Sequence, residues 1–271
     1  TVALSGDGAD ELFGGYNKHR GEYQIRHGGT KGALISSLAP LWKVLPQSRN
    51  SRAGNLIRKL AKFSEGRALT ARERYWRWCG YADAAYLENL FVRSMGDWQE
   101  FEKLRNELTQ FINETPDLND VLRNDVHLVL PGDMLSKVDL MSMANSLEVR
   151  TPFLDYRVVE YAFSLSSTLK LNGKEGKLVL RQAFREILPE ALFNRPKHGF
   201  EVPLLKWFRN ELESWIFDEL LNREFIVEQG LFNPDALDKL RVQLHSASPG
   251  DSTARLWALV VFQYWWKKWM I

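Results

Sequence analysis

The chain has 271 residues, of which 45% are hydrophobic and 26% are charged, and this composition predicts a soluble globular protein of one or two domains. Its formal net charge of +2 gives no sequence-wide reason to expect a nucleic-acid or membrane partner. The single cysteine, Cys79, excludes an intrachain disulfide framework and a cysteine-rich zinc site. Such cysteine usage fits a reducing compartment, so we expect a cytoplasmic protein. No apolar run reaches the ~18 residues that cross a bilayer, and no signal peptide is visible.

The chain opens with a short apolar segment and a turn of small residues. Val2–Leu4 has the character of a buried strand, residues 5–8 form a tight turn, and Ala9–Phe13 begins a helix with acidic residues in its first turn. A strand, a glycine turn and a helix N-terminus form a ligand-binding corner in α/β proteins. Because no turn or cap precedes the strand and Thr1 is not an initiator residue, we expect a fragment of a longer protein.

Helical patterns dominate the rest of the chain. Residues 30–115 alternate such patterns with Pro, Gly and Ser breaks, and we interpret them as a helical insertion. Apolar spacing from Asn119 to Asn145 predicts two helices that meet at a kink at Pro131 and Gly132. Further helices are predicted near 155–165, 177–187, 203–222, 234–245 and 252–269. Almost no strand signal follows Leu4, so the fold is predicted to be mainly α.

Three carboxylates stand at the turn into the first helix. Asp7, Asp10 and Glu11 occupy positions i, i+3 and i+4, a spacing that would bring their side chains together at one corner. Magnesium takes one or two such carboxylates and leaves its other positions to water and phosphate oxygens, which suits a nucleotide site. The alternative is that these residues cap the helix and complement its dipole. The spacing leaves both interpretations open.

Charged residues recur between positions 133 and 150, where their neighbours are mostly apolar or small. We therefore expect them to be partly buried and paired, with Asp133 and Lys137 as an i, i+4 pair. Arg150 precedes a Thr-Pro dipeptide that forces an extended exit, so its guanidinium would suit a carboxylate or phosphate beyond that point. A structural pair between Arg150 and either Glu148 or Asp155 is the alternative.

Lysines in two glycine-bearing loops are candidates for contacts with phosphate. Lys197 lies between a proline and a His-Gly pair, where it could stabilise charge that develops during a reaction. A solvated loop lysine is the alternative for Lys197, and the same holds for Lys174 and Lys177.

The last predicted helix carries a strongly apolar face. Trp257, Val261 and Trp265 recur there at helical spacing. This pattern favours core packing over a stacking platform for a ligand.

Several of these stretches resemble the asparagine synthase C-terminal domain family, which includes β-lactam synthetases. The similar stretches occur in the family's order: VALSGDGADELFGGY (residues 2–16), SMANSLEVRTPFLD (142–155), KLVLR (177–181) and RPKHGF (195–200). The resemblance covers nearly the whole of residues 1–271 and is weakest between residues 30 and 115. It implies the C-terminal part of an α/β adenine-nucleotide α-hydrolase-like (PP-loop) synthetase domain, with about one strand of its parallel sheet retained.

The resemblance also implies a reaction. ATP, with Mg, adenylates a carboxylate with release of pyrophosphate, and ammonia derived from glutamine then displaces AMP to form an amide. Aspartate is the family's default substrate, and a polysaccharide or peptide carboxylate is an alternative. The roles implied for individual residues are these: Asp10 would bind magnesium; Ser5 and Gly6 would lie against the nucleotide; Asp7 would orient or deprotonate the incoming nitrogen; Glu11 would hold the substrate's polar groups; Lys197 would stabilise transition-state charge; and Lys177, Arg150, Asp133 and Lys137 would line the pyrophosphate and substrate side.

Two features of that family are absent from the 271 residues. One is the Ser-Gly-Gly-x-Asp-Ser pyrophosphate loop, and the other is the glutaminase domain with its N-terminal cysteine nucleophile. We therefore expect this chain to be inactive alone. A non-catalytic helical interaction module or a degraded paralogue is the alternative. Because a domain cut through its sheet exposes strand groups and apolar surface, we also expect a homodimer or aggregate.

Overall fold

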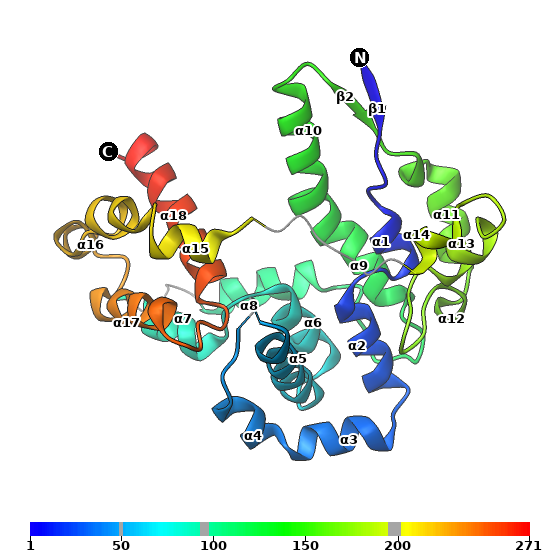
Figure 1. The fold of residues 1–271 in the computed structure, drawn as a ribbon, viewed down its shortest axis with the longest axis horizontal. Coiled ribbons are helices and arrows are strands. Elements are labelled where there is room, and N and C mark those ends of the chain that lie inside the picture. The colour runs from blue at the N-terminus through cyan, green and yellow to red at the C-terminus, as the bar shows by residue number, and fades with distance from the viewer. Residues whose placement is uncertain (49–50, 93–97, 195–201) are drawn as a thin grey trace. The chain divides into compact units, whose positions relative to one another are not determined.

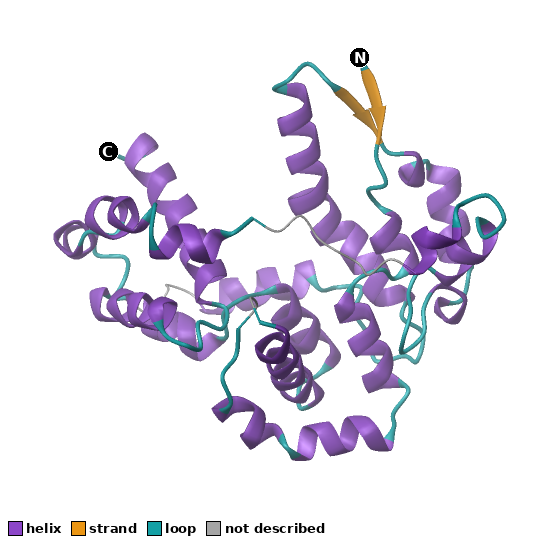
Figure 2. Cartoon of the chain, in the orientation of Figure 1, coloured by secondary structure: helices purple, strands orange, loops and turns teal. Residues whose placement is uncertain are grey.

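The structure is a computed structural model that describes residues 1–48, 51–92, 98–194 and 202–271. Its backbone contacts divide the chain into two compact units. Unit 1 comprises residues 1–34, 69–76 and 103–197, and unit 2 comprises residues 35–68, 77–102 and 198–271. Within the described ranges the fold is mainly helical and contains one two-stranded sheet (Figure 1, Figure 2). The predicted α-rich class is confirmed, whereas the predicted insertion at 30–115 stays a prediction.

The sheet of unit 1 pairs two strands that lie far apart in the sequence. β1 (Val2–Leu4) pairs in parallel with β2 (Glu148–Arg150), with Ala3 opposite Val149. The ladder continues one residue further, because the Ser5 amide donates to the Arg150 carbonyl oxygen at 2.9 Å. Both strands therefore end at the same edge. β1 was predicted and β2 was not.

Helices of unit 1 pack around small apolar clusters, two of which lie among the described residues close to α1 (Ala9–Phe13) and α9 (Asn119–Val129). Leu12, Phe13 and Ala162 form one cluster, and residues 118, 122 and 171, all leucines, form the other. The helical elements are α1, α2 (Asn17–Arg26), α9, the π-helical turn η1 (Leu130–Leu135), α10 (Ser136–Met143), the 3₁₀ turn η2 (Pro152–Leu154), α11 (Tyr156–Ser164), α12 (Ser167–Lys170), α13 (Leu178–Ala183) and α14 (Glu190–Asn194). Three further helices have residues in both units: α3 (Thr30–Ser37), α6 (Ala71–Cys79) and α8 (Trp98–Leu108).

The predicted kink at Pro131 is wrong in form. α9, η1 and α10 follow one another without a break in helical conformation, and the proline lies in the π-helical turn. A proline lacks the N–H of the α-helical ladder, and a π-bulge can absorb that missing bond within a continuous helix.

Unit 2 has its own leucine-rich core. Its elements are α4 (Ala39–Val44), α5 (Arg52–Arg67), α7 (Ala84–Leu90), α15 (Leu204–Arg209), the π-helical turn η3 (Trp215–Leu220), α16 (Arg223–Gln229), α17 (Pro234–His245) and α18 (Ser252–Trp269). The core includes Phe208, Ile216, Leu244 and Leu256, all fully buried. The predictions at 234–245 and 252–269 are confirmed, and the predicted helix at 203–222 is divided into α15 and η3.

The predicted core face of α18 is wrong by one position. Leu256, Leu259 and Val260 are buried, whereas Trp257 and Val261 are each 49% exposed. Both stripes are apolar and both follow helical spacing, so periodicity alone does not distinguish them. The aliphatic stripe of Leu256, Leu259 and Val260 is the one that packs inward, and α18 contacts α17 and the core of unit 2.

Candidate active site

The candidate site in unit 1 begins where the two parallel strands end. Ser5, Gly6 and Asp7 follow β1, next to the end of β2, and lead into α1. The turn needs glycine at position 8, where φ is +89° and an added Cβ would overlap the side chain of Leu154. The carboxyl edge of a parallel sheet is where open α/β folds bind ligands.

Asp7 and Asp10 have different partners. The Ser5 hydroxyl donates to Asp7 Oδ2 at 2.5 Å, and Lys177 Nζ lies 3.1 Å from Asp10 Oδ1. Of the residues that the structure describes, no group of three or more His, Cys, Asp or Glu side chains could hold a metal ion. The predicted gathering of three carboxylates is therefore not observed, and magnesium binding by Asp10 stays a prediction.

The ion pair between Asp10 and Lys177 depends on the close approach of two loops. Lys177 has a left-handed backbone (φ +57°), and its amide donates to the Phe13 carbonyl oxygen at 2.8 Å. A Cβ at Gly176 would overlap the Gly14 carbonyl oxygen, so glycine is required at that contact. A non-glycine residue in this conformation is strained by about 1–2 kcal/mol, and such strain clusters at functional sites. The sequence alone did not indicate a partner for Lys177, and the fold shows that the partner is Asp10.

Glu11 is buried, with 1% of its surface exposed, and belongs to a different set of contacts. The Tyr16 phenol donates to Glu11 Oε1 at 2.5 Å. Burial raises the pKa of Tyr16, and so do the hydrogen bond to Glu11 and the nearby charges of Asp10 and Asp125. This phenol therefore stays protonated and acts as a donor to the carboxylate.

Behind Tyr16 lies a buried carboxylate that sequence reasoning missed. Asp125 of α9 accepts from His19 Nε2 at 2.7 Å, Lys18 Nζ at 2.6 Å and the Tyr75 hydroxyl at 2.5 Å. Burial acts to raise the pKa of Asp125, but the hydrogen bond from His19 and the charge of Lys18 lower it. The one signal in the sequence is a charged residue at position 125 within the apolar face of α9, beside the buried positions 121 and 122.

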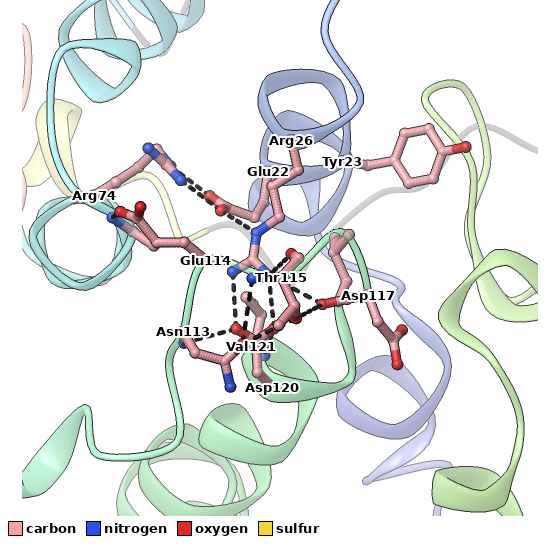
Figure 3. Close-up of polar contacts among 12 residues, drawn as sticks. Glu22, Tyr23, Arg26, Arg74, Asn113, Glu114, Thr115, Asp117, Asp120 and Val121 are labelled. Atoms are coloured by element: carbon pink, nitrogen blue, oxygen red, sulfur yellow. Dashed lines mark hydrogen bonds and ion pairs between the residues drawn. The ribbon is translucent and has the colours of Figure 1, made fainter.

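A second buried network ties α2 to α6 and α9 (Figure 3). Arg74 donates to both oxygens of Glu22, at 2.6 and 2.7 Å, and Arg26 Nε donates to the same carboxylate at 2.7 Å. Arg26 also makes a bidentate contact with Asp120, both distances being 3.0 Å. Burial raises the pKa of Asp120, although Arg26 acts to lower it. These bidentate pairs hold α2, which follows the candidate site directly in the chain.

The charged residues between 133 and 150 are exposed, and their predicted contacts with pyrophosphate and substrate stay predictions. Asp133, Lys137 and Arg150 are exposed, so their predicted partial burial is wrong. Arg150 Nε pairs with Glu148 Oε1 at 2.8 Å, which is the structural alternative. Lys137 Nζ contacts the sulfur of Met134 at 3.7 Å, and the predicted pair with Asp133 is not observed. Lys197 lies outside the described residues.

Comparison of the sequence with known proteins assigns the chain to a family. A family model described as asparagine synthase matches residues 1–267. The chain belongs to the asparagine synthase family. Asparagine synthetase [glutamine-hydrolyzing] 1 of Bacillus subtilis is 31% identical over 276 residues, which cover 98% of this chain and 40% of that protein. Asparagine synthetase 3 of the same organism is 30% identical, covering 80% of this chain and 29% of that protein. The Gallus gallus asparagine synthetase is 34% identical over 109 residues, which are 36% of this chain and 19% of that protein.

This member of the asparagine synthase family spans about 40% of the length of the first relative named above. No solved structure matches the chain. In the part of the chain that the structure describes, no helix is both long and apolar enough to cross a membrane.

Proposed function

We propose that this chain supplies part of the synthetase site of a glutamine-dependent, amide-forming ligase of the asparagine synthetase type. The observation that carries the proposal is the ion pair of Asp10 and Lys177 beside the carboxyl edge of a parallel strand pair, in a chain that matches the asparagine synthase family over residues 1–267.

The finer fold that we propose is a PP-loop synthetase domain whose sheet extends beyond the two strands of unit 1. Parallel sheets are normally covered on both faces, but Leu4 of β1 is 75% exposed. Apolar side chains on α10 are exposed as well, among them Leu140, Met141 and Met143. Further strands and helices of the full-length protein would cover this surface and would bring the pyrophosphate loop to the carboxyl edge.

The chemistry consists of two substitutions. A carboxylate oxygen of the substrate, which we propose is aspartate, attacks the α-phosphorus of ATP; the bond to the bridging oxygen breaks and pyrophosphate leaves. Ammonia then attacks the acyl carbon, the bond to AMP breaks, and nitrogen loses a proton. Asp7 would orient the nitrogen or accept that proton, and Lys177 would lie beside the departing phosphates. Lys197 would stabilise charge in both transition states.

Asp10 suits a magnesium ion. The ion takes one or two protein carboxylates and fills its other positions with water and phosphate oxygens. The Asp10 side chain is partly exposed, and glycine at position 15 leaves room beside it, because a Cβ there would overlap the carboxylate. When bound, the ion would neutralise phosphate charge. Lys177 provides the positive charge beside Asp10 in this structure.

ATP–pyrophosphate exchange with aspartate, measured on the full-length protein, tests the proposal. We expect exchange in the wild type, a loss of at least about 100-fold in Asp10→Asn, and none in the isolated 271-residue chain. Asp235→Asn is the matched control, since Asp235 pairs with Arg223 on the exposed surface of unit 2. Wild-type exchange with a peptide or polysaccharide carboxylate in place of aspartate would correct the substrate. No exchange with any of these acids would overturn the proposed function.

A further inference from the structure

We infer that the buried Asp125 is a positioning residue, which orients Tyr16 through His19 and thereby fixes the carboxylate of Glu11. The inference rests on the proposed function for one point: the synthetase site would use Glu11 to hold the substrate's polar groups, as the family resemblance implies. The positioning itself is a property of the chain and can be measured separately.

Asp125 is the anchor of this arrangement. It lies on α9, is fully buried, and accepts hydrogen bonds from donors on two other helices. Its Oδ1 receives Lys18 Nζ of α2 and the Tyr75 hydroxyl of α6, and its Oδ2 receives His19 Nε2 of α2. Oδ1 keeps Lys18 as a donor if the Tyr75 hydroxyl is removed, whereas among the described residues Oδ2 receives His19 alone, so the bond to His19 is the one that a buried carboxylate holds in place.

His19 carries this constraint to Tyr16. Its Nδ1 accepts the backbone N–H of Tyr16 at 3.3 Å, so the ring proton lies on Nε2 and is donated to Asp125. This pattern fixes which ring nitrogen donates and which one accepts. The two rings also pack together, with centroids 5.3 Å apart. The backbone and the ring of Tyr16 are thus both held by His19.

Tyr16 transmits the constraint to Glu11. Its hydroxyl donates to Glu11 Oε1 at 2.5 Å, and within the described part of the chain no donor to Oε2 is found. Glu11 lies on α1, a helix of five residues that is too short to hold itself by backbone bonds alone. The direction of the Glu11 carboxylate therefore comes from Tyr16. Oε2 can then accept a hydrogen bond from a donor on the substrate, and Tyr16 orients the Glu11 carboxylate for that contact.

The chain offers a matched pair of variants. Tyr16→Phe and Tyr75→Phe each remove one phenol hydroxyl that donates to a buried carboxylate at 2.5 Å, but only Tyr16 touches Glu11. A third variant, His19→Gln, keeps an N–H donor for Asp125 near the Nε2 position and loses the acceptor for the Tyr16 amide. A merely structural network predicts the same outcome for all three. The positioning role predicts that Tyr75→Phe differs from the other two.

The first measurement is carboxyl labelling of the full-length protein with a carbodiimide and glycine ethyl ester, with the Glu11 peptide followed by mass spectrometry. We expect labelling of Glu11 about fivefold faster than in the wild type for Tyr16→Phe and His19→Gln, and an unchanged rate for Tyr75→Phe. Equal rates in all three variants would overturn the inference, whether or not the protein is active.

The second measurement separates binding from chemistry. In ATP–pyrophosphate exchange, Tyr16→Phe should raise KM for the acid substrate about tenfold, with kcat and the KM for ATP within about twofold of the wild type. Tyr75→Phe should leave all three constants unchanged. Wild-type exchange with identical constants for both variants would refute the role of Tyr16. A wild type without exchange would refute only the proposed function, because the labelling rates still decide the positioning.

Discussion

Replacement of Glu22 by glutamine is the sharpest test of how unit 1 is held together. The substitution keeps the shape of the side chain and removes one negative charge from a buried group of two arginines and two carboxylates. Glu22 accepts on both oxygens: Oε1 from Arg26 and Arg74, and Oε2 from Arg74. An amide can accept on its oxygen alone, so its NH₂ group would face an arginine N–H at the other position.

The loss of a hydrogen bond and the loss of a negative charge at Glu22 both lower the stability of the folded chain. The donor–donor contact loses a charge-assisted hydrogen bond, and the network is left with one uncompensated buried positive charge. Breaking a buried pair on one side lowers stability by about 3–5 kcal/mol, and we expect about 3 kcal/mol for Glu22→Gln because the amide keeps part of the bonding. Glu65→Gln is the control: Arg77 Nε also contacts Glu65 at 2.7 Å, but the Glu65 side chain is 33% exposed, so its loss is expected to be about 1 kcal/mol or less.

The assay is urea unfolding followed by far-UV circular dichroism, for the wild type and both variants, at about 0.05 M and 0.5 M salt. Salt screens exposed pairs and hardly affects buried ones, so only the smaller effect of Glu65→Gln should shrink at high salt. A loss for Glu22→Gln no larger than that for Glu65→Gln would refute the view that this network is buried and tightly paired.

Three further outcomes are expected. Burial lowers the pKa of Lys170 from 10.5 to about 8. Between these two pH values the unfolded chain binds more protons than the folded chain, so the free energy of unfolding rises with pH, by at most roughly 3 kcal/mol. Lys170→Met should abolish this rise, as measured by urea unfolding at pH 8 and 10. Gly176→Ala should destabilise the protein by several kcal/mol, since the added Cβ would overlap the Gly14 carbonyl oxygen. Gly132→Ala is the control: this glycine lies in a helical turn with open space around it, so the substitution should be neutral or should stabilise the protein by up to about 1 kcal/mol in the same assay. The isolated chain should self-associate at moderate concentration through exposed apolar residues such as Leu4, and a monomer at all concentrations in sedimentation would contradict this.

The helices that sequence patterns locate well are those with strong local signals. α17 begins at Pro234 after Asn233, whose side chain accepts the Asp235 amide at 3.0 Å, and an asparagine cap followed by proline is a local start signal. β2 had no comparable signal. Its three residues alternate charged, apolar and charged, and they are a strand only because β1 lies beside them. Such pairing depends on a partner about 146 positions away in register, which no local pattern contains.

The buried networks were beyond prediction for the same reason. His19 and Asp125 are separated by 106 positions, and Glu22 and Arg74 by 52. A polar residue at a core position indicates that a partner exists, but it does not say which one. The resemblance to the asparagine synthase family pointed to Glu11, Asp10 and Lys177 as separate residues. The structure adds that Lys177 contacts Asp10 and that a tyrosine holds Glu11.

The acidic corner shows why helical spacing was an incomplete guide to the site. The i, i+3, i+4 rule applies to residues on one helix, but α1 begins at Ala9, after the left-handed Gly8, so Asp7 lies in the turn and not on the helix face. The two carboxylates that do lie on α1 are adjacent in sequence, and neighbouring helical positions point in different directions. Asp10 consequently reaches a lysine at a partly exposed position, while Glu11 is buried against a phenol that stays protonated. Among the described residues, Asp10 is the one of the three that has a cation as its partner, which is why the proposed function gives it, and not Asp7 or Glu11, the metal ion.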